Sequence, residues 1–219
     1  MARDGEDGGG EDGGVDGGTG EDGTGIRWLA GWEGWFVGLT FARGIGPAEL
    51  AARLGAVPGV RPGPMGAAAA WSMAAETADG DGVARVGAWG SWSFAVEHGI
   101  PAGAERLAEV SRGAEAVHLD PQPDHPPKQF AYACDGELVC CFGLGEECWR
   151  GGHRPDFLLP ELVRAGILAP DGTHPWPDGE PRPERDRLTL AVLEHRFGLA
   201  LPRRLVEDAP LPAFVTRTR

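Results

Sequence analysis

Two short runs of alternating residues joined by Asp135-Gly136 constrain the fold of this chain more than any other feature. Both runs, residues 129–134 and 137–142, are rich in aromatic, Val and Cys side chains, and such runs favour β-strands. An Asp-Gly dipeptide tolerates the positive φ angles that a type I′ turn requires. The sequence therefore predicts a β-hairpin, and with it an antiparallel sheet.

The remaining segments predict strands and helices that do not alternate regularly, which favours an α+β fold over a doubly wound one. We predict a single domain over residues 26–219, with a mostly antiparallel sheet and flanking helices. Period-2 patterns predict strands at 35–42, 83–87, 91–96 and 115–119. Helical patterns predict helices at 47–55, 65–77, 104–111, 155–168, 184–197 and 202–207, followed by a frayed end. Pro/Gly-rich loops are expected near 57–64, 120–127 and 170–183.

Residues 1–25 differ in composition from everything that follows. They carry eight carboxylates against Arg3, a net charge of −7, and almost no apolar side chain. A segment that buries no apolar surface cannot offset the entropy of ordering, so we predict a disordered acidic Gly-rich tail. A calcium-binding Gly-Asp repeat would need an apolar residue in every nine-residue turn, and Val15 alone fits that requirement.

Charge and cysteine usage restrict the partners and the compartment. The net charge of −13 repels phosphate, so nucleic acid and anionic membranes are disfavoured as partners of the whole protein. The absence of a basic-apolar leader and of an apolar run of about 18 to 20 residues indicates a protein that stays in the cytoplasm. The four cysteines all lie between 134 and 148, unlike a secreted disulfide framework, which fits a reducing compartment.

Four sequence blocks, taken in order, point to a family. They are GLTFARGIGPAELAARLG from Gly38, SWSFAVE from Ser91, SRGAEAV from Ser111 and FAYACDGELV from Phe130. Together they resemble a family of actinobacterial proteins that carries only a domain-of-unknown-function label. The resemblance extends over roughly residues 35–205, and it implies no activity.

The strongest candidate for catalysis is a cluster at the end of the strand predicted at 115–119. His118, Asp120, Asp124 and His125 combine imidazoles with carboxylates, which could act as an acid/base pair or bind a metal. The loop that holds them is rich in proline and matches no hydrolase signature. The alternative is an ordinary strand end followed by a solvated loop.

Metal and nucleotide sites are weaker interpretations. Cys134, Cys140, Cys141 and Cys148 lack the two-residue spacing of structural zinc sites, and adjacent cysteines in a strand face opposite sides, so we expect no metal and no cofactor. A site made by Cys148, His153 and distant residues is left open. The glycine turn at 44–46 resembles a phosphate-binding loop, but Glu49 stands where a dinucleotide fingerprint has its third glycine.

Two binding hypotheses concern tryptophans and arginines. The tryptophans at 28, 32, 35, 89, 92 and 149 are expected in the core, whereas Trp176, in a Pro-rich loop, is a candidate contact residue. The helices predicted at 184–197 and 202–207 have helix-turn-helix spacing, with Arg203 and Arg204 at the start of the second, but about six residues are too few to read a DNA groove.

The sequence thus favours a non-catalytic protein that binds another macromolecule, and we expect that partner to be a protein. The alternatives are a small enzyme that uses the cluster around His118 and a DNA-binding regulator that uses the C-terminal segment. Because the catalytic signatures fail, the interaction hypothesis is preferred.

Overall fold

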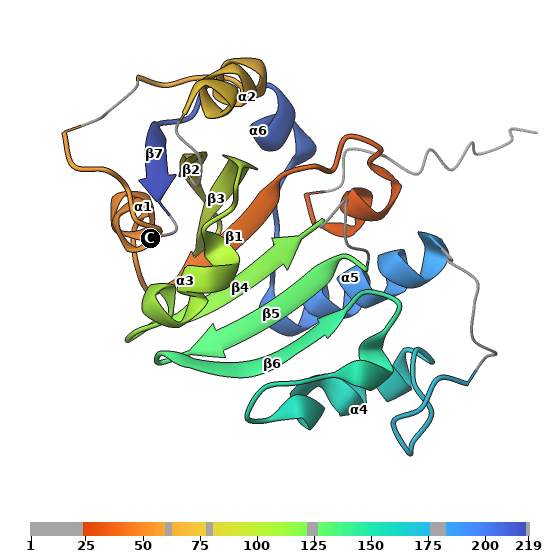
Figure 1. Cartoon of the computed structure of the whole chain (residues 1–219). Coiled ribbons are helices and arrows are strands. Elements are labelled where there is room, and N and C mark those ends of the chain that lie inside the picture. Colours follow the sequence, from red (N-terminus) through yellow and green to blue (C-terminus); the bar gives the residue numbers. More distant parts are fainter. Residues whose placement is uncertain (1–23, 60–62, 78–80, 122–126, 176–182, 218–219) are drawn as a thin grey trace, which may run out of the picture.

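The computed structural model describes residues 24–59, 63–77, 81–121, 127–175 and 183–217. In these ranges the chain forms one seven-stranded antiparallel sheet in the order β6-β5-β4-β1-β3-β2-β7 (Figure 1). The α+β fold with flanking helices is therefore confirmed. The strands are β1 (Gly38–Arg43), β2 (Asp81–Trp89), β3 (Trp92–Gly99), β4 (Glu115–Asp120), β5 (Gln129–Cys134), β6 (Glu137–Gly143) and β7 (Ala213–Arg217).

The predicted hairpin is β5–β6, and its turn has the backbone that the Asp-Gly pair suggests. Asp135 and Gly136 have φ angles of 52° and 86°, and Asp135 is the one non-glycine residue with positive φ in the described ranges. A register shift between Tyr132 and Ala133 marks a bulge in this hairpin. The second hairpin, β2–β3, turns at Gly90 with φ 59° and places Trp89 opposite Trp92.

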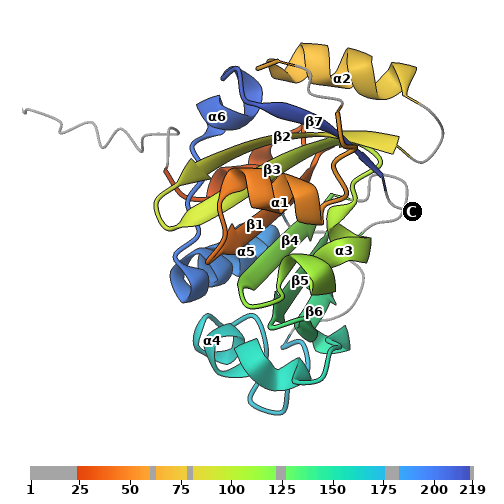
Figure 2. The same ribbon diagram turned by 90° about the vertical axis from the view of Figure 1, so that its left-hand side faces the viewer.

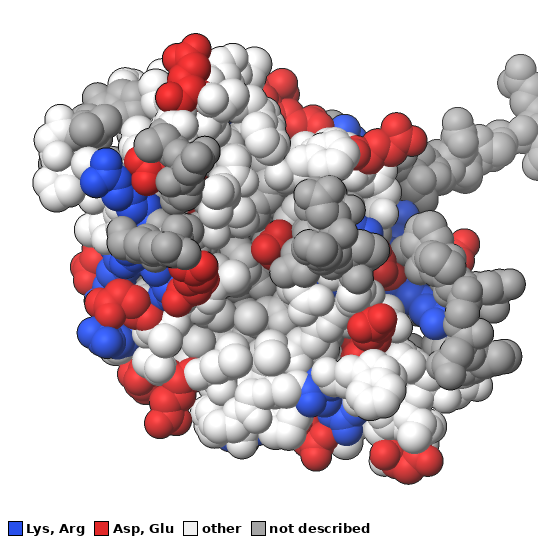
Figure 3. All heavy atoms as spheres, viewed as in Figure 1, with Lys and Arg blue, Asp and Glu red and all other residues white. Residues whose placement is uncertain are grey.

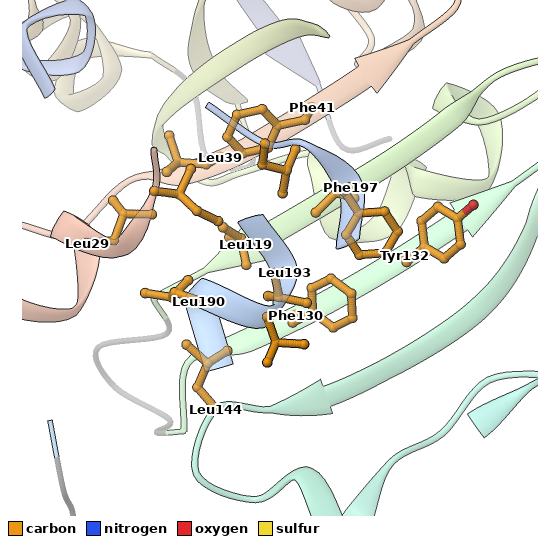
Figure 4. Packing of buried hydrophobic residues seen from close by; sticks show 14 of the residues in the cluster. Leu29, Leu39, Phe41, Leu119, Phe130, Tyr132, Leu144, Leu190, Leu193 and Phe197 are labelled. Atoms are coloured by element: carbon orange, nitrogen blue, oxygen red, sulfur yellow. The ribbon is translucent and has the colours of Figure 1, made fainter. Parts of the chain in front are cut away.

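One face of the sheet holds the larger core, in which aromatic and leucine side chains interdigitate (Figure 4). Helix α5 (Pro183–Phe197) lies along this face and places Leu190, Leu193 and Phe197 against the strands. Phe197 packs on Tyr132, with ring centroids 4.7 Å apart. The same side is completed by η1 (Arg27–Gly31), η2 (Glu147–Trp149), η3 (Pro155–Leu158), α4 (Leu159–Arg164) and α6 (Arg203–Glu207).

The opposite face is built from smaller side chains, chiefly alanine and valine. Helices α1 (Pro47–Arg53) and α3 (Gly103–Val110) cover it, and they bury Leu50 and Leu107 against it. Figure 2 shows both helices in front of the central strands, with α2 (Ala67–Glu76) above β2 and β7. Small residues on this face let α1 and α3 approach the sheet closely.

Two sequence expectations about the ends of the chain differ in outcome. The prediction of a frayed C-terminus is wrong, because Ala213–Arg217 forms β7 and pairs with residues 81–85 of β2. The predicted disordered tail, apart from Thr24 and Gly25, lies outside the described residues, as do parts of the three predicted Pro/Gly-rich loops.

Both outer strands of the sheet are hydrogen-bonded along their free edges. On β6, Cys141 exchanges two backbone hydrogen bonds with Gly151, of 3.1 and 2.7 Å. On β7, the carbonyl of Val215 accepts a hydrogen bond from Val57, and the amide of Arg217 donates to Gly55. No helix in the described ranges combines the length and apolar character needed to cross a membrane.

Candidate functional site

Three neighbouring strands at the centre of the sheet bring Thr40, Glu97 and His118 together beneath α3. The hydroxyl of Thr40 lies 2.6 Å from Glu97 Oε1 and 2.8 Å from His118 Nδ1. All three residues are buried, with at most 1% of each exposed. These side-chain contacts link all three strands, and an ion pair between Arg43 and Glu115 also joins β1 to β4.

The direction of the hydrogen bonds in this cluster follows from its chemistry. A carboxylate accepts, so Thr40 donates its single proton to Glu97, and His118 must then donate from Nδ1 to the Thr40 oxygen. Burial lowers the pKa of His118, while Glu97 and Asp120 oppose that shift. His118 is therefore neutral, and its Nε2 accepts no hydrogen bond from the described residues.

Hydroxyl, imidazole and carboxylate are the groups of a hydrolytic triad, but here they are connected in another order. In a triad the imidazole lies between the other two and removes the proton of the hydroxyl. Here the hydroxyl of Thr40 lies between them, and its proton is committed to Glu97. The cluster is also closed to solvent, so this arrangement does not activate Thr40 as a nucleophile.

The cluster instead anchors the start of α3. Glu97 Oε2 accepts hydrogen bonds from the backbone amides of Ala102 and Gly103, at 2.7 and 3.0 Å. These amides open the helix and have no partner within it, and a carboxylate satisfies them well. Gly103 lies so close to the cluster that a Cβ there would meet Thr40 Oγ1 at 2.1 Å and His118 Nδ1 at 2.3 Å.

We expect Gly103→Ala to lower the free energy of unfolding by about 1 to 3 kcal/mol, because the methyl group must displace α3 or break the cluster. The matched control is Gly31→Ala, since a Cβ at Gly31 meets no atom within 4 Å. Urea denaturation of both variants measures the difference. Equal stability of the two would contradict the close approach of α3.

A second buried polar group, Arg85 with His98, lies on the opposite face of the sheet. Arg85 donates from Nε to His98 Nε2 at 3.0 Å, and from Nη1 and Nη2 to the carbonyls of Ala209 and Val206. Burial lowers the pKa of Arg85 to about 10, so it stays charged at neutral pH. The carbonyls at the C-terminal end of α6 carry partial negative charge and offset this buried cation.

His98 is held neutral by this arrangement. Burial, and then the charge of Arg85, lower its pKa to about 3. Because Nε2 accepts from Arg85, the proton of the ring is on Nδ1, which has no partner among the described residues. The ring of Trp71 on α2 contacts His98 edge-on at 5.2 Å. The pair therefore joins β2, β3, α2 and α6.

The third buried polar group is centred on Glu147, which belongs to the turn at residues 146–150. We call this segment the Trp149 turn. Glu147 is fully buried, and its Oε1 accepts from the amide of Gly145 at 2.9 Å and from the hydroxyl of Thr189 at 2.6 Å. His174 Nε2 lies 4.0 Å from Glu147 Oε2, beyond hydrogen-bond distance. Glu147 thereby ties the turn to α5.

The side chain of Trp149 points away from this anchor and is 81% exposed. It is the most exposed of the large hydrophobic side chains in the described ranges. Our expectation of a core position for Trp149 is therefore wrong. The short η2 segment directs Glu147 inward and Trp149 outward, whereas Trp35 and Trp92, which lie in or next to strands, are buried as expected.

The structure describes two residues of the predicted catalytic cluster. His118 is in the core and Asp120 is half-buried at the end of β4, while Asp124 and His125 lie outside the described residues. Trp176 also lies outside them. Arg203 and Arg204 are exposed on α6, which spans five residues, and Arg203 pairs with Glu207 at 2.8 Å.

The cysteines make no disulfide, and no group of three or more His, Cys, Asp or Glu side chains in the described ranges is arranged to hold a metal ion. Cys140 is buried and the adjacent Cys141 is half-buried on the other face, as the strand geometry predicts. Burial raises the pKa of the Cys140 thiol to about 12, so it is not a nucleophile at neutral pH. His153 contacts Leu138 and Glu137.

A shallow groove separates α1 from α3, where acidic and basic side chains are mixed at the surface (Figure 3). Its arginines are engaged by the protein itself. Arg53 binds Glu49 and the carbonyls of Val110 and Arg112, and Arg106 binds the carbonyl of Arg217. The groove therefore presents no concentrated charge of one sign.

Thr40 and Glu97, and the Arg85–His98 pair on the other face of the sheet, were not predicted as site residues. A signal for two of them is present in the sequence, since Glu97 and Arg85 are charged residues within strands that are otherwise apolar. A charge at such a position needs a buried partner. The partners themselves come from other strands and cannot be read from local sequence.

Residues 27–216 match a family of unknown function, DUF6461. The chain belongs to this family. The match runs from the start of η1 to Thr216 in β7, so the buried groups described above lie within the family's domain. No curated protein and no solved structure matches the chain.

Proposed function

We propose that this DUF6461 member is a non-catalytic protein-binding module whose contact surface is centred on Trp149. The observation that carries the proposal is the 81% exposure of this indole on a turn that is otherwise fixed to the domain. Trp is among the residues that contribute most to binding at protein interfaces, which makes an almost fully exposed indole a candidate contact residue.

The Trp149 turn is fixed on both sides of the indole. On one side the buried carboxylate of Glu147 binds Gly145 and Thr189. On the other side Arg150 donates to Asp156 Oδ1 at 2.7 Å and to the carbonyl of Gly172 at 3.2 Å. A side chain held in this way loses little backbone entropy when a partner covers it, which favours binding.

The exposed charges near the turn have both signs. Glu146 and Arg154 are exposed, and Arg150 and Asp156 neutralise each other. Asp171, which adjoins the Gly172 that Arg150 contacts, has a pKa lowered by hydrogen bonds from Thr173 and is ionised at neutral pH. A complementary partner would offer an apolar pocket for the indole and basic side chains opposite Glu146 and Asp171.

The paired edges of the sheet favour partner binding through surface side chains over binding by addition of a strand. A peptide that extends a sheet needs unpaired backbone groups on an outer strand. Residues 138–141 of β6 and 215–217 of β7 already bind neighbouring segments of this chain. A partner would have to displace those segments first, whereas the Trp149 turn is accessible without any rearrangement.

The alternative functions have less support from the described residues. The enzyme hypothesis needs an accessible His118, but this side chain is buried and hydrogen-bonded to Thr40. For the DNA-binding hypothesis, α6 has five residues and Arg203 is already paired. Both stay predictions from sequence.

We expect Trp149→Ala to weaken partner binding by about 2 kcal/mol or more, roughly a thirtyfold rise in Kd. The full chain is used as bait in an extract of the source cells, and co-purifying proteins are quantified by mass spectrometry. The control is Leu188→Ala, which removes another exposed apolar side chain, 44% exposed on α5. We expect one or more proteins to co-purify with wild type and with the control but not with Trp149→Ala. The Kd of such a partner is then measured with purified proteins.

Thermal melting accompanies this experiment, because a mostly exposed indole contributes little to stability and all three proteins should melt at nearly the same temperature. Co-purification of the same proteins in the same amounts with all three baits would overturn the proposal.

A further inference from the structure

We propose that Arg154 and Arg196, which lie over the ring of Phe157, form a binding site for a phosphate monoester. The guanidinium carbons of Arg154 and Arg196 are 5.2 and 4.7 Å from the centre of this ring. Such contacts between a guanidinium and an aromatic face hold the cation in a defined place. The inference does not depend on the proposed Trp149 surface.

Three elements meet at the Phe157 ring. Phe157 lies in η3, Arg154 directly precedes η3, and Arg196 lies in the last turn of α5. On β5, the ring of Tyr132 stacks on Phe157, with centroids 5.2 Å apart and an angle of 25° between the planes. Because Tyr132 occupies one face of the Phe157 ring, the two guanidiniums share the rest of it. Both long side chains can therefore reach a single anion.

The N–H groups of the two guanidiniums are not used by the described part of the chain. Neither donates a hydrogen bond there, whereas the guanidinium of Arg150 binds Asp156 and the carbonyl of Gly172. Glu161 Oε1 lies 3.7 Å from Arg196 Nε, beyond hydrogen-bond distance, and Arg196 is the more exposed member of this pair, at 39% against 24%. A stacked guanidinium keeps the N–H groups at its edge free, and these form a fork that matches phosphate oxygens.

The group carries an excess of positive charge. Arg154 is exposed and forms no ion pair with the described residues. Glu161 opposes Arg196, and Asp156, which adjoins the ring in the sequence, is paired with Arg150. Three arginines therefore meet two carboxylates, which leaves one positive charge on a chain whose net charge is −13. This local charge attracts a small anion to the two free guanidiniums.

The arrangement suits a phosphate monoester better than a carboxylate or a nucleic acid. The two oxygens of a carboxylate are satisfied by the fork of a single guanidinium. A phosphate monoester has three acceptor oxygens and about 1.5 to 2 negative charges at neutral pH, so both arginines can donate to it. The phosphodiesters of nucleic acid carry one charge each, on a polymer that the net charge of this protein repels.

Magnetic resonance of the arginine Nε–H groups in the isotope-labelled full-length protein tests the site. The probes are a short peptide with one phosphoserine, the same peptide with glutamate in that position, and glycerol phosphate. The phosphopeptide should shift the resonances of Arg154 and Arg196 together and saturate with a Kd on the order of 1 mM. The glutamate peptide should bind at least about fivefold more weakly. Tighter binding of the phosphopeptide than of glycerol phosphate assigns the ligand to a protein side chain, and equal binding assigns it to a small molecule.

Variants separate this site from a general effect of charge. Arg154→Gln and Arg196→Gln should each raise the Kd for the phosphopeptide about tenfold. The control, Arg187→Gln, removes an exposed arginine from the same helix as Arg196 and changes the net charge equally, so the Kd should stay nearly constant. Phe157→Leu keeps an apolar side chain but removes the ring beneath both guanidiniums, and should raise the Kd about threefold or more. Thermal melting checks that each variant is folded.

Three results would overturn the proposal. One is equal affinity for the phosphopeptide and the glutamate peptide. Another is the same Kd in Arg154→Gln as in Arg187→Gln. The third is tighter binding of a short single-stranded DNA than of the phosphopeptide at the same salt concentration, which would assign the two arginines to nucleic acid.

Discussion

Replacing Glu97 with alanine should lower the free energy of unfolding by about 3 to 5 kcal/mol. The carboxylate accepts from the amides of Ala102 and Gly103 and from the hydroxyl of Thr40. Without it, three donors stay buried and unpaired, and such donors lose their hydration without compensation. Urea denaturation at neutral pH measures the loss.

Two further variants separate the cluster from a general effect of removing a carboxylate. Glu105→Ala removes an exposed Glu from the first turn of α3 and should cost less than about 1 kcal/mol. Glu97→Gln keeps the shape of the side chain and one accepting oxygen, so its loss of stability should lie between those of Glu97→Ala and Glu105→Ala. It provides a folded variant for measurement if Glu97→Ala does not fold. A loss for Glu97→Ala no larger than for Glu105→Ala would refute the anchoring role.

The parts of the fold that could be predicted are those with local causes. The β5–β6 hairpin depends on Asp135 and Gly136 at adjacent positions, and β3 on an alternation within six residues. In contrast, β7 is a strand because residues 213–217 find β2, about 130 positions earlier in the chain. Nothing within five residues of β7 distinguishes it from a frayed terminus.

The candidate sites were harder to predict for the same reason. Thr40 meets partners 57 and 78 positions away, so the cluster exists only after β1, β3 and β4 have paired. Trp149 is exposed because Glu147, two positions earlier, is bound by Thr189 from α5. Hydrophobicity alone assigns an indole to the core, and the anchor that turns this one outward comes from another element.

Acidification should destabilise the protein through His98, whose folded-state pKa is about 3 while that of an unfolded histidine is about 6.5. Between these values the unfolded chain binds a proton that the folded protein excludes, so stability falls as pH falls. The contribution is fully present above pH 6.5. At pH 4.5, two units below the unfolded pKa, about 2 to 3 kcal/mol of it is lost.

The physical cause is the position of His98 between a buried guanidinium and an aromatic ring. A proton on Nε2 would break the hydrogen bond from Arg85 and place two cations 3.0 Å apart without water. Burial also lowers the pKa of His118, which therefore adds to the loss with the same sign. Acid should thus loosen both faces of the sheet.

The measurement is urea denaturation at pH 7 and pH 4.5 for wild type, His98→Gln and His153→Gln. Glutamine can accept from Arg85 but does not titrate, so the gap in stability between wild type and His98→Gln should shrink by about 2 to 3 kcal/mol on acidification. The control His153→Gln makes the same substitution at a histidine whose side chain is 44% exposed, and it reports the effect of this change at the surface. If the His98→Gln gap is constant, the buried imidazole is not the group that acid attacks, and the Arg85 pairing does not exclude its proton.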